Sequence, residues 1–382
     1  MFRFFKHIQE LGRFQQLATV KKRLVFYSEG KNYWVHLEGL IKELLENHDI
    51  QISFISSNEN DPGLQIKHPR YHSFEIDEGW IRNWLFENIE TNVMVMTMPD
   101  IGQYQVKRSK NPVHYVYLQH SLVSKHMVYR PGAFDHYDSI FCAAPHHLKE
   151  IRAIEARYNL PKKDLYKHGY ARLDDIIHQA KLRPKPLKDQ SKPIHILLAP
   201  SWGPNSIIET IGMQVVDTLL ARGYQLTLRP HPQTIKFSSL IVNKIVKKHQ
   251  DDGLFNFEAN VDGQESLHQS DLMICDWSGA ALDYAFGLNK PVVFIDVPRK
   301  VNNPDYAEID IEPYEVSVRE NIGTIVSLNE LDSLPEKIEA SLNKHHELGI
   351  DCDVFSLGSS AQTGAKFLME ILTSIGSKGK FS

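Results

Sequence analysis

The sequence predicts two α/β domains in tandem, each with a parallel β-sheet covered by helices on both faces. Strand-like apolar runs alternate with helix-like runs along almost the whole chain, which is typical of doubly wound folds. The chain has 382 residues, a length that suits two ordinary domains better than one. The proline-rich, basic residues 181–193 interrupt the alternation, and we interpret them as the linker between the domains.

The first domain is expected over residues 24–180. Short apolar runs predict its strands, and leucines and isoleucines at helical spacing between Leu37 and Leu45 predict its first helix. The strands are expected at 23–30, 51–56, 91–99, 112–120, 139–145 and 165–170, and a further helix at 146–159.

The second domain is expected over residues 194–358 and shows the same alternation. Its strands are expected at 194–200, 224–232, 254–258, 271–277 and 291–296, and its helices at 206–223, 238–250 and 279–288. A last helix over 361–375, within the C-terminal segment 359–382, is expected to cross back to the first domain. Ligands of such sheets bind beyond the carboxyl ends of the strands, so we expect the site in a cleft between the domains.

Residues 1–23 form a basic, amphipathic segment with a single acidic residue, Glu10. Aromatic residues on one face of a helix and basic residues on the other suit the surface of an anionic membrane. A helix packed on its own domain, with a solvated basic face, is the alternative. The apolar residues at helical spacing are Phe4, Ile8, Leu11, Phe14 or Gln15, and Leu17 or Ala18.

The composition argues against several classes of protein. A hydrophobic fraction of 42% argues against a disordered scaffold, and a net charge of −4 argues against a nucleic-acid partner. The three cysteines are widely spaced and form no zinc-binding pair, so free thiols in a reducing compartment are expected. The sequence shows neither a membrane-spanning run of roughly 18 apolar residues nor a signal peptide. We therefore expect a cytoplasmic protein, with peripheral contact to the inner face of the membrane left open.

The strongest motif lies at the end of the strand expected at 224–232. Arg229 and His231 are separated and followed by prolines, which fix the backbone around the imidazole. A planar guanidinium suits phosphate oxygens, so Arg229 is predicted to bind a diphosphate and His231 to help neutralise it. The alternative is a simple turn that the histidine caps.

A second motif, residues 276–279, joins the strand expected at 271–277 to a helix. Ser278 is a fitting N-cap, and Gly279 lets a ligand approach the backbone N–H groups at the helix N-terminus. Asp276, Ser278 and Gly279 are therefore predicted to form a phosphate site, with an ordinary capped helix as the alternative.

Four residues of the first domain are expected near the same ligand. His120 ends a strand and is a candidate general base on an acceptor hydroxyl, because an ordinary imidazole pKa is near neutral. A satisfied polar residue at a strand end is its alternative. Glu29 and Gly30 follow the first strand, where a glycine admits an acceptor close to the backbone. Arg172 is expected either to bind the donor or to tie down the linker.

At these residues the chain resembles the CDP-glycerol glycerophosphotransferase family of teichoic acid synthesis, over about residues 90–300. The family's Arg-Pro-His-Pro element matches residues 229–232 fully, and its Asp-Tyr-Ser-Ser element is similar to 276–279, with Trp277 for Tyr and Gly279 for the second Ser. Its Gly-Tyr-Pro-Arg-Asn-Asp element resembles 169–174. Its Ala-Pro-Thr-Trp strand end resembles 199–202, which adds Ser201 to the expected phosphate-binding residues.

The resemblance implies a GT-B fold, in which two Rossmann-like domains face each other across a cleft. It also implies transfer of glycerol phosphate, or a related polyol phosphate, from a CDP-activated donor. The main departure concerns the family's His-Gly-Thr-Pro-Leu-Lys element, of which His120 is matched but is followed by Ser121, Leu122 and Val123. We therefore expect a divergent member whose acceptor is a capsule or lipopolysaccharide material.

The expected mechanism assigns catalysis to two histidines. His120 removes the proton of an acceptor hydroxyl, which attacks the β-phosphorus, while Arg229 and His231 stabilise the departing CMP. No cofactor or metal site is predicted, and dependence on Mg²⁺ is left open. The acceptor is expected to be a polysaccharide or lipid-linked molecule. Two alternatives are a GT-B glycosyltransferase that uses a sugar nucleotide and an inactive partner that binds nucleotide or polymer.

Overall fold

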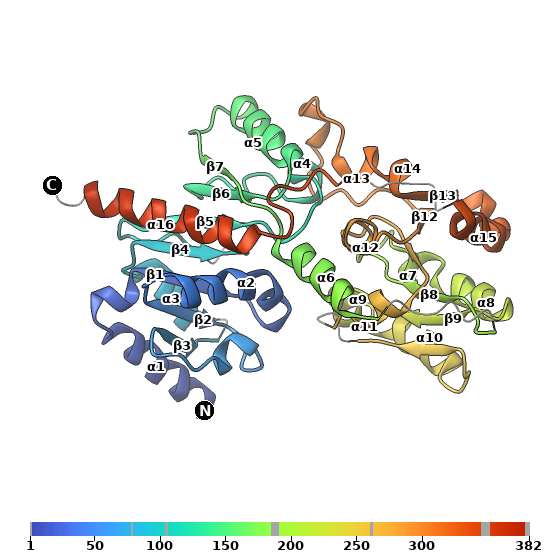
Figure 1. Ribbon diagram of the computed structural model, residues 1–382, viewed down its shortest axis with the longest axis horizontal. Helices are drawn as coiled ribbons and strands as arrows, with labels where there is room; N and C mark the ends of the chain where they lie inside the picture. The colour runs from blue at the N-terminus through green and yellow to red at the C-terminus, as the bar shows by residue number, and fades with distance from the viewer. Residues whose placement is uncertain are drawn as a thin grey trace.

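The structure is a computed structural model that describes residues 2–77, 79–103, 106–184, 191–259, 263–344 and 352–378. Residues 185–190 of the expected linker and 379–382 of the expected C-terminal tail lie outside these ranges. Figure 1 shows two α/β domains side by side, each built around its own sheet. The predicted fold class is confirmed.

The first sheet has seven parallel strands in the order β3-β2-β1-β4-β5-β6-β7. Its central strands are buried along their whole length, which explains why they are continuous apolar runs rather than alternating ones. The strands are β1 (Leu24–Ser28), β2 (Ile52–Ser56), β3 (Tyr71–Glu75), β4 (Val93–Met96), β5 (His114–Leu118), β6 (Ser139–Cys142) and β7 (Asp164–Lys167). The helices are α1 (Phe2–Gln15), α2 (Lys31–Asn47), α3 (Trp80–Asn88), α4 (Lys125–Val128), α5 (Pro145–Arg157) and α6 (Ala171–Leu182), with the 3₁₀ turns η1 (Thr19–Lys22) and η2 (Pro62–Gln65).

The second sheet has six parallel strands in the order β10-β9-β8-β11-β12-β13. They are β8 (His195–Leu198), β9 (Gln225–Leu228), β10 (Phe255–Phe257), β11 (Leu272–Cys275), β12 (Val292–Asp296) and β13 (Gly323–Ser327). The helices before β12 are α7 (Ile207–Thr210), α8 (Gly212–Ala221), α9 (Pro232–Phe237), α10 (Ser239–His249), α11 (Glu265–Gln269) and α12 (Ala280–Leu288). Those after it are η3 (Tyr306–Glu308), α13 (Tyr314–Ser317), α14 (Arg319–Ile322), η4 (Leu328–Ser333), α15 (Leu334–Lys344) and α16 (Ser360–Lys378).

The register of the second sheet brings its predicted motifs to one edge. Leu198 of β8 stands opposite both Leu228 of β9 and Ile274 of β11. The loops that follow these three strands therefore begin side by side, and they carry the three predicted motifs of this domain.

Two of the differences between the structure and the predicted elements concern a helix and the edge strands. The helix predicted over 206–223 is two helices, α7 and α8, because the backbone of Ile211 leaves the helical region at φ −127° and ψ 11°. The edge strands β3 and β13 were not predicted. β3 carries the half-buried polar residues His72 and Ser73, so it lacks the continuous apolar run of the inner strands.

The C-terminal helix α16 lies on the first domain, although it follows the second domain in the chain (Figure 1). Leu368 and Leu372 of α16 are buried in the same apolar cluster as Leu40 and Leu44 of α2. The helix thereby completes the cover over one face of the first sheet.

Candidate active site between the two domains

His231 is fixed by the helix that it begins. It is the N-cap of α9, and its Nδ1 accepts a hydrogen bond from the backbone N–H of Gln233 at 3.1 Å. Burial and the nearby Lys300 lower its pKa to about 3, so the imidazole is neutral at physiological pH. Because Nδ1 is an acceptor in a neutral ring, the proton is on Nε2. His231 is therefore both a helix cap and a hydrogen-bond donor.

Arg229 is buried and held by the start of α11. Its guanidinium donates to the Ser266 hydroxyl at 3.2 Å and to the backbone oxygen of Gly263 at 3.0 Å. Burial raises the pKa of Asp283 in α12, and the charge of Arg229 is among the influences that oppose this shift. The structure thus places this cation beside the helix predicted to bind phosphate.

Asp276 and Ser201, both predicted to bind phosphate, are joined to each other. One carboxylate oxygen of Asp276 accepts the backbone N–H of Ser201 at 2.7 Å, and the other accepts that of Ile207 at 3.0 Å. Asp276 therefore positions the loop after β8 and the start of α7, which is a structural contribution that the sequence did not predict.

Ser278 and Gly279 form the start of α12. The helix begins one residue later than predicted, with Gly279 rather than Ser278 as its N-cap residue, and the Ser278 hydroxyl accepts the N–H of Ala280 at 3.3 Å. A Cβ atom on Gly279 would lie 2.8 Å from the hydroxyl of Ser121 and 3.4 Å from a methyl of Val123. The loop after β5 in the first domain therefore lies directly against the N-terminus of α12 in the second.

His120 stands in that loop, at the edge of a cluster of aromatic rings. Its Nδ1 lies 3.0 Å from the Tyr117 hydroxyl, and its ring is in contact range of His36 and Tyr33. Burial and the charge of Lys125 lower the pKa of His120 to about 3, while a backbone hydrogen bond to Thr97 opposes this shift. The ring is thus neutral, as a general base requires.

Arg172 ties the domains together. Its Nε donates to Asp283 of α12 at 3.0 Å, and Asp283 is also 3.5 Å from the Tyr170 hydroxyl. The same hydroxyl lies 3.2 Å from the backbone oxygen of His120. This ion pair joins the two domains, and donor binding by Arg172 stays a prediction.

Glu29 and Gly30 lie beyond the end of β1. Gly30 has φ +153°, a conformation that favours glycine, and begins α2. Burial raises the pKa of the Tyr117 hydroxyl that hydrogen-bonds His120, and the charge of Glu29 adds to this shift, so Glu29 borders the same aromatic cluster.

Two lysines were missed in the sequence. Lys300, after β12, lies 4.3 Å over the Trp202 ring, and burial lowers its pKa to about 8. Lys125 is buried among Tyr117, Tyr129 and Phe134, and burial lowers its pKa to about 7. Lys125 stands five residues after His120, where the family's element has its lysine, and this spacing was the available signal. Lys300 had no comparable signal.

Metal ligands and thiols add little to this site. No group of three or more histidine, cysteine, aspartate or glutamate side chains in the described ranges is arranged to hold a metal ion. Cys142 and Cys275 are buried free thiols, and Cys352 is half-buried.

Residues 13–300 match the family model of CDP-glycerol:poly(glycerophosphate) glycerophosphotransferases. This chain belongs to that family. It is therefore a glycerophosphotransferase-like enzyme with the GT-B fold, as predicted. No curated protein matches the sequence significantly.

Solved structures share the fold at low identity. The wall teichoic acid polymerase TagF, soaked with CDPG, is 13% identical with a TM-score of 0.53, over 98% of this chain and 95% of that one. UDP-GlcNAc 2-epimerase from Neisseria meningitidis is 12% identical with a TM-score of 0.60, over 91% and 99%. The Methanocaldococcus jannaschii epimerase is 14% identical with a TM-score of 0.58, over 91% and 99%.

Proposed function

We propose that this glycerophosphotransferase uses CDP-glycerol and an acceptor hydroxyl of an envelope polysaccharide or lipid-linked molecule, with His120 and His231 as its catalytic pair. The contact of Gly279 with Ser121 carries the proposal. It sets the loop of His120 against the helix N-terminus of Ser278, so a base and an anion site from different domains adjoin one ligand.

The donor side uses neutral and cationic groups together. The backbone N–H groups at the start of α12 bind the diphosphate, and the Nε2–H of His231 donates to an oxygen of the departing CMP. Lys300 and Arg229 add positive charge at the same edge of the sheet. We infer these roles because Arg229 follows β9 and Lys300 follows β12, and both strands end at this edge of the sheet.

The acceptor side uses His120 as the base. When Tyr117 donates its hydrogen to Tyr129, at 3.5 Å, its oxygen accepts Nδ1–H of His120, and Nε2 is left unprotonated. Nε2 then takes the proton of the acceptor hydroxyl, whose oxygen bonds to the β-phosphorus. The bond from that phosphorus to the bridging oxygen breaks, and CMP leaves.

The variant His231→Asn separates capping from catalysis. Asparagine is a good N-cap, so α9 is expected to be retained, while the Nε2–H donor is lost. We expect turnover to fall by roughly 10²–10⁴ with an unchanged melting temperature. CMP release from CDP-glycerol is the measurement, and His178→Asn, an exposed histidine in α6, is the control. Turnover near wild type would remove His231 from the mechanism.

Donor identity is tested by thermal stabilisation with CMP, CDP, UDP, GDP and ADP, each with and without Mg²⁺. A ligand that binds only the folded state raises the melting temperature. We expect a selective shift with CMP and CDP. A selective shift with UDP or GDP would instead favour a sugar-nucleotide donor, and no shift at all would favour an inactive partner.

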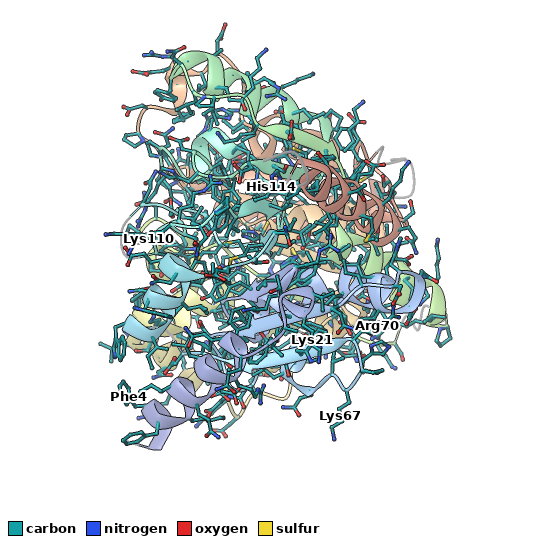
Figure 2. The ribbon with its side chains drawn as sticks, turned by 90° about the vertical axis from the view of Figure 1, so that its left-hand side faces the viewer. Phe4, Lys21, Lys67, Arg70, Lys110 and His114 are labelled. Atoms are coloured by element: carbon teal, nitrogen blue, oxygen red, sulfur yellow. The ribbon has the colours of Figure 1, made fainter. Side chains whose placement is uncertain are left out.

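We further propose peripheral contact with the inner face of a membrane through α1 and α3. None of the described helices is long and apolar enough to span a bilayer. Phe5 of α1 and Trp80 of α3 are 62% and 61% exposed, and Phe4, labelled at the tip of α1 in Figure 2, packs on Trp80 with ring centroids 5.8 Å apart. Exposed tryptophan and phenylalanine side chains of this kind favour the membrane interface.

The other half of α1 is not available to lipid. Phe14 is buried against Phe74, and Leu11 and Leu17 pack on the same apolar cluster. Lys6 pairs with Glu75 and Arg13 pairs with Glu10, which reduces the basic character of the segment. The apolar stripe predicted along the whole helix is thus divided, and its aromatic N-terminal end carries the proposed contact.

Liposome flotation tests this contact. The double variant Phe5→Ser/Trp80→Ser is expected to lower partitioning into anionic vesicles by at least about tenfold, because each side chain contributes apolar burial. Phe237→Ser, which changes an exposed phenylalanine of the second domain, is the matched control. Equal partitioning of the double variant and wild type would contradict the proposal.

A further inference from the structure

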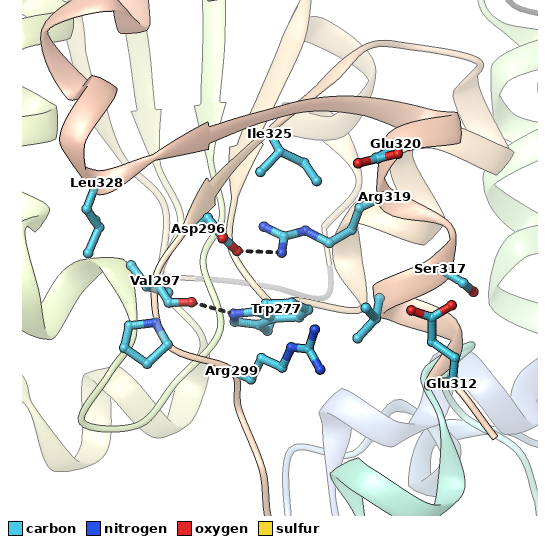
Figure 3. Close-up of a pocket in the computed structure, with 12 residues that line it drawn as sticks. Trp277, Asp296, Val297, Arg299, Glu312, Ser317, Arg319, Glu320, Ile325 and Leu328 are labelled. Carbon is cyan, nitrogen blue, oxygen red and sulfur yellow. Dashed lines mark hydrogen bonds and ion pairs between the residues drawn. The ribbon is translucent and has the colours of Figure 1, made fainter. Parts of the chain in front are cut away.

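A pocket of about 600 Å³ lies beside the second sheet, next to the ends of β12 and β13. Figure 3 shows it between Trp277, the loop after β12, and the segment that carries Arg319. Trp277 stands between Asp276 and Ser278 in the chain, but its ring turns into this pocket, where Nε1 donates to the backbone oxygen of Val297 at 2.9 Å. One motif thus borders two sites.

Arg319 is a buried cation with unused donors. It is only 4% exposed, and one nitrogen pairs with Asp296 at 2.8 Å. Its Nε and Nη2 make no hydrogen bond with any residue of the described ranges. Because buried N–H groups without an acceptor are costly, these two nitrogens favour a ligand that brings oxygen atoms.

The ring of Trp277 is not free to stack on a ligand. The Arg319 guanidinium lies 4.0 Å from the ring centroid and that of Arg299 lies 5.8 Å from it, on either side of the ring in Figure 3. Trp277 is the aromatic residue of the lining, so a nucleobase would find no ring face here.

The charged side chains that line the pocket restrict the class of ligand further. Two guanidinium groups stand among three carboxylates, those of Asp296, Glu312 and Glu320. A diphosphate would meet this acidic rim unfavourably, whereas hydroxyl groups donate to carboxylates and a singly charged phosphate accepts from arginine. A phosphodiester-linked polyol has one negative charge per repeat. It offers phosphate oxygens that accept from arginine and hydroxyl groups that donate to carboxylates.

We propose that this pocket binds a segment of phosphodiester-linked polyol, which is the chemistry that glycerol phosphate transfer adds to the acceptor, while the donor occupies the other side of residues 276–279. The inference rests on the proposed function for the identity of the polymer. Arg319 and Arg299 bind the phosphodiester oxygens, and the carboxylates bind hydroxyl groups. The pocket binds a part of the acceptor that does not react. It therefore governs affinity for the acceptor rather than for the donor.

The test measures binding of a short oligo(glycerol phosphate) and of CDP to the full chain by calorimetry. Arg299→Ala is expected to weaken oligomer binding about tenfold and Arg319→Gln about 10- to 100-fold, because each removes charge-assisted hydrogen bonds. CDP affinity is expected to be unchanged in both. Arg222→Ala is the matched control, since Arg222 is an exposed arginine of the same domain that pairs with Glu336. Arg299 is exposed, so its variant decides the matter if Arg319→Gln fails to fold.

The outcomes separate this inference from the proposed function. Wild-type protein that binds CDP but not the oligomer would overturn the pocket assignment alone, as would unchanged oligomer affinity in Arg299→Ala. Displacement of the oligomer by cytidine, or equal affinity for inorganic phosphate, would also overturn it. Failure of the wild type to bind CDP would instead contradict the proposed donor.

Discussion

Gly279 is the residue at which the two halves of the proposed site meet. Its φ of −60° and ψ of −20° suit alanine, so the effect of Gly279→Ala is steric rather than conformational. The new Cβ would lie 2.8 Å from the Ser121 hydroxyl and would push the His120 loop away from α12. We expect kcat/KM for transfer to fall by about 10- to 100-fold, because small misplacements of reacting groups are costly.

The double variant Gly279→Ala/Ser121→Ala is the control for this prediction. Removing the hydroxyl removes the close contact, so we expect most of the lost kcat/KM to return. If the double variant is as slow as the single one, the contact does not set the position of His120.

Individual residues differed in how well the sequence predicted them. Arg229 and His231 stand out in the sequence because prolines beside charged groups at a strand end are unusual, and their roles stay predictions. Lys300 does not stand out, since its partner His231 is distant in the chain. Tyr117 does not stand out either, since its place depends on burial. Asp276 stands out in the sequence as part of a motif, but its two backbone partners depend on loops whose approach no local pattern encodes.

Among the elements, α16 shows how far chain order and spatial order can differ. Leu368 is buried in the apolar cluster of the first sheet. Leu368→Ala is expected to lower the free energy of unfolding by about 2–5 kcal/mol through lost burial and a cavity. Urea unfolding measures this, and Thr373→Ala, at an exposed position of the same helix, is expected to change it little. Equal stability of the two variants would mean that α16 is not part of this core.

Inner strands and long amphipathic helices could be predicted, because full burial produces continuous apolar runs and one-sided burial produces helical spacing. The edge strand β3 could not, since its half-buried residues are polar. The helix over 206–223 has an uninterrupted apolar pattern, and only the backbone of Ile211 reveals the break.

For the whole molecule, buried histidines predict loss of stability in mild acid. Burial is the main cause that lowers their pKa values: to about 3 for His120 and His231, to about 4 for His146 and His168, and well below the ordinary value for His36 and His147. In the unfolded chain the same rings have pKa values near 6.5. Between about pH 6.5 and 4 the unfolded state therefore binds more protons, and the free energy of unfolding falls as the pH falls.

His168 offers the clearest test, because it is buried between Phe141 and α16 and lies outside the proposed site. Its contribution is complete above about pH 6.5 and is lost toward pH 4, with a slope of up to about 1.4 kcal/mol per pH unit. His168→Asn is expected to reduce the slope of unfolding free energy against pH by that amount between pH 6.5 and 5, whatever its effect at neutral pH. Urea unfolding at half-unit pH steps gives the slope, and the exposed His178→Asn is expected to leave it unchanged. An unchanged slope in His168→Asn would mean that this ring is protonated in the folded protein, and that burial there does not exclude charge.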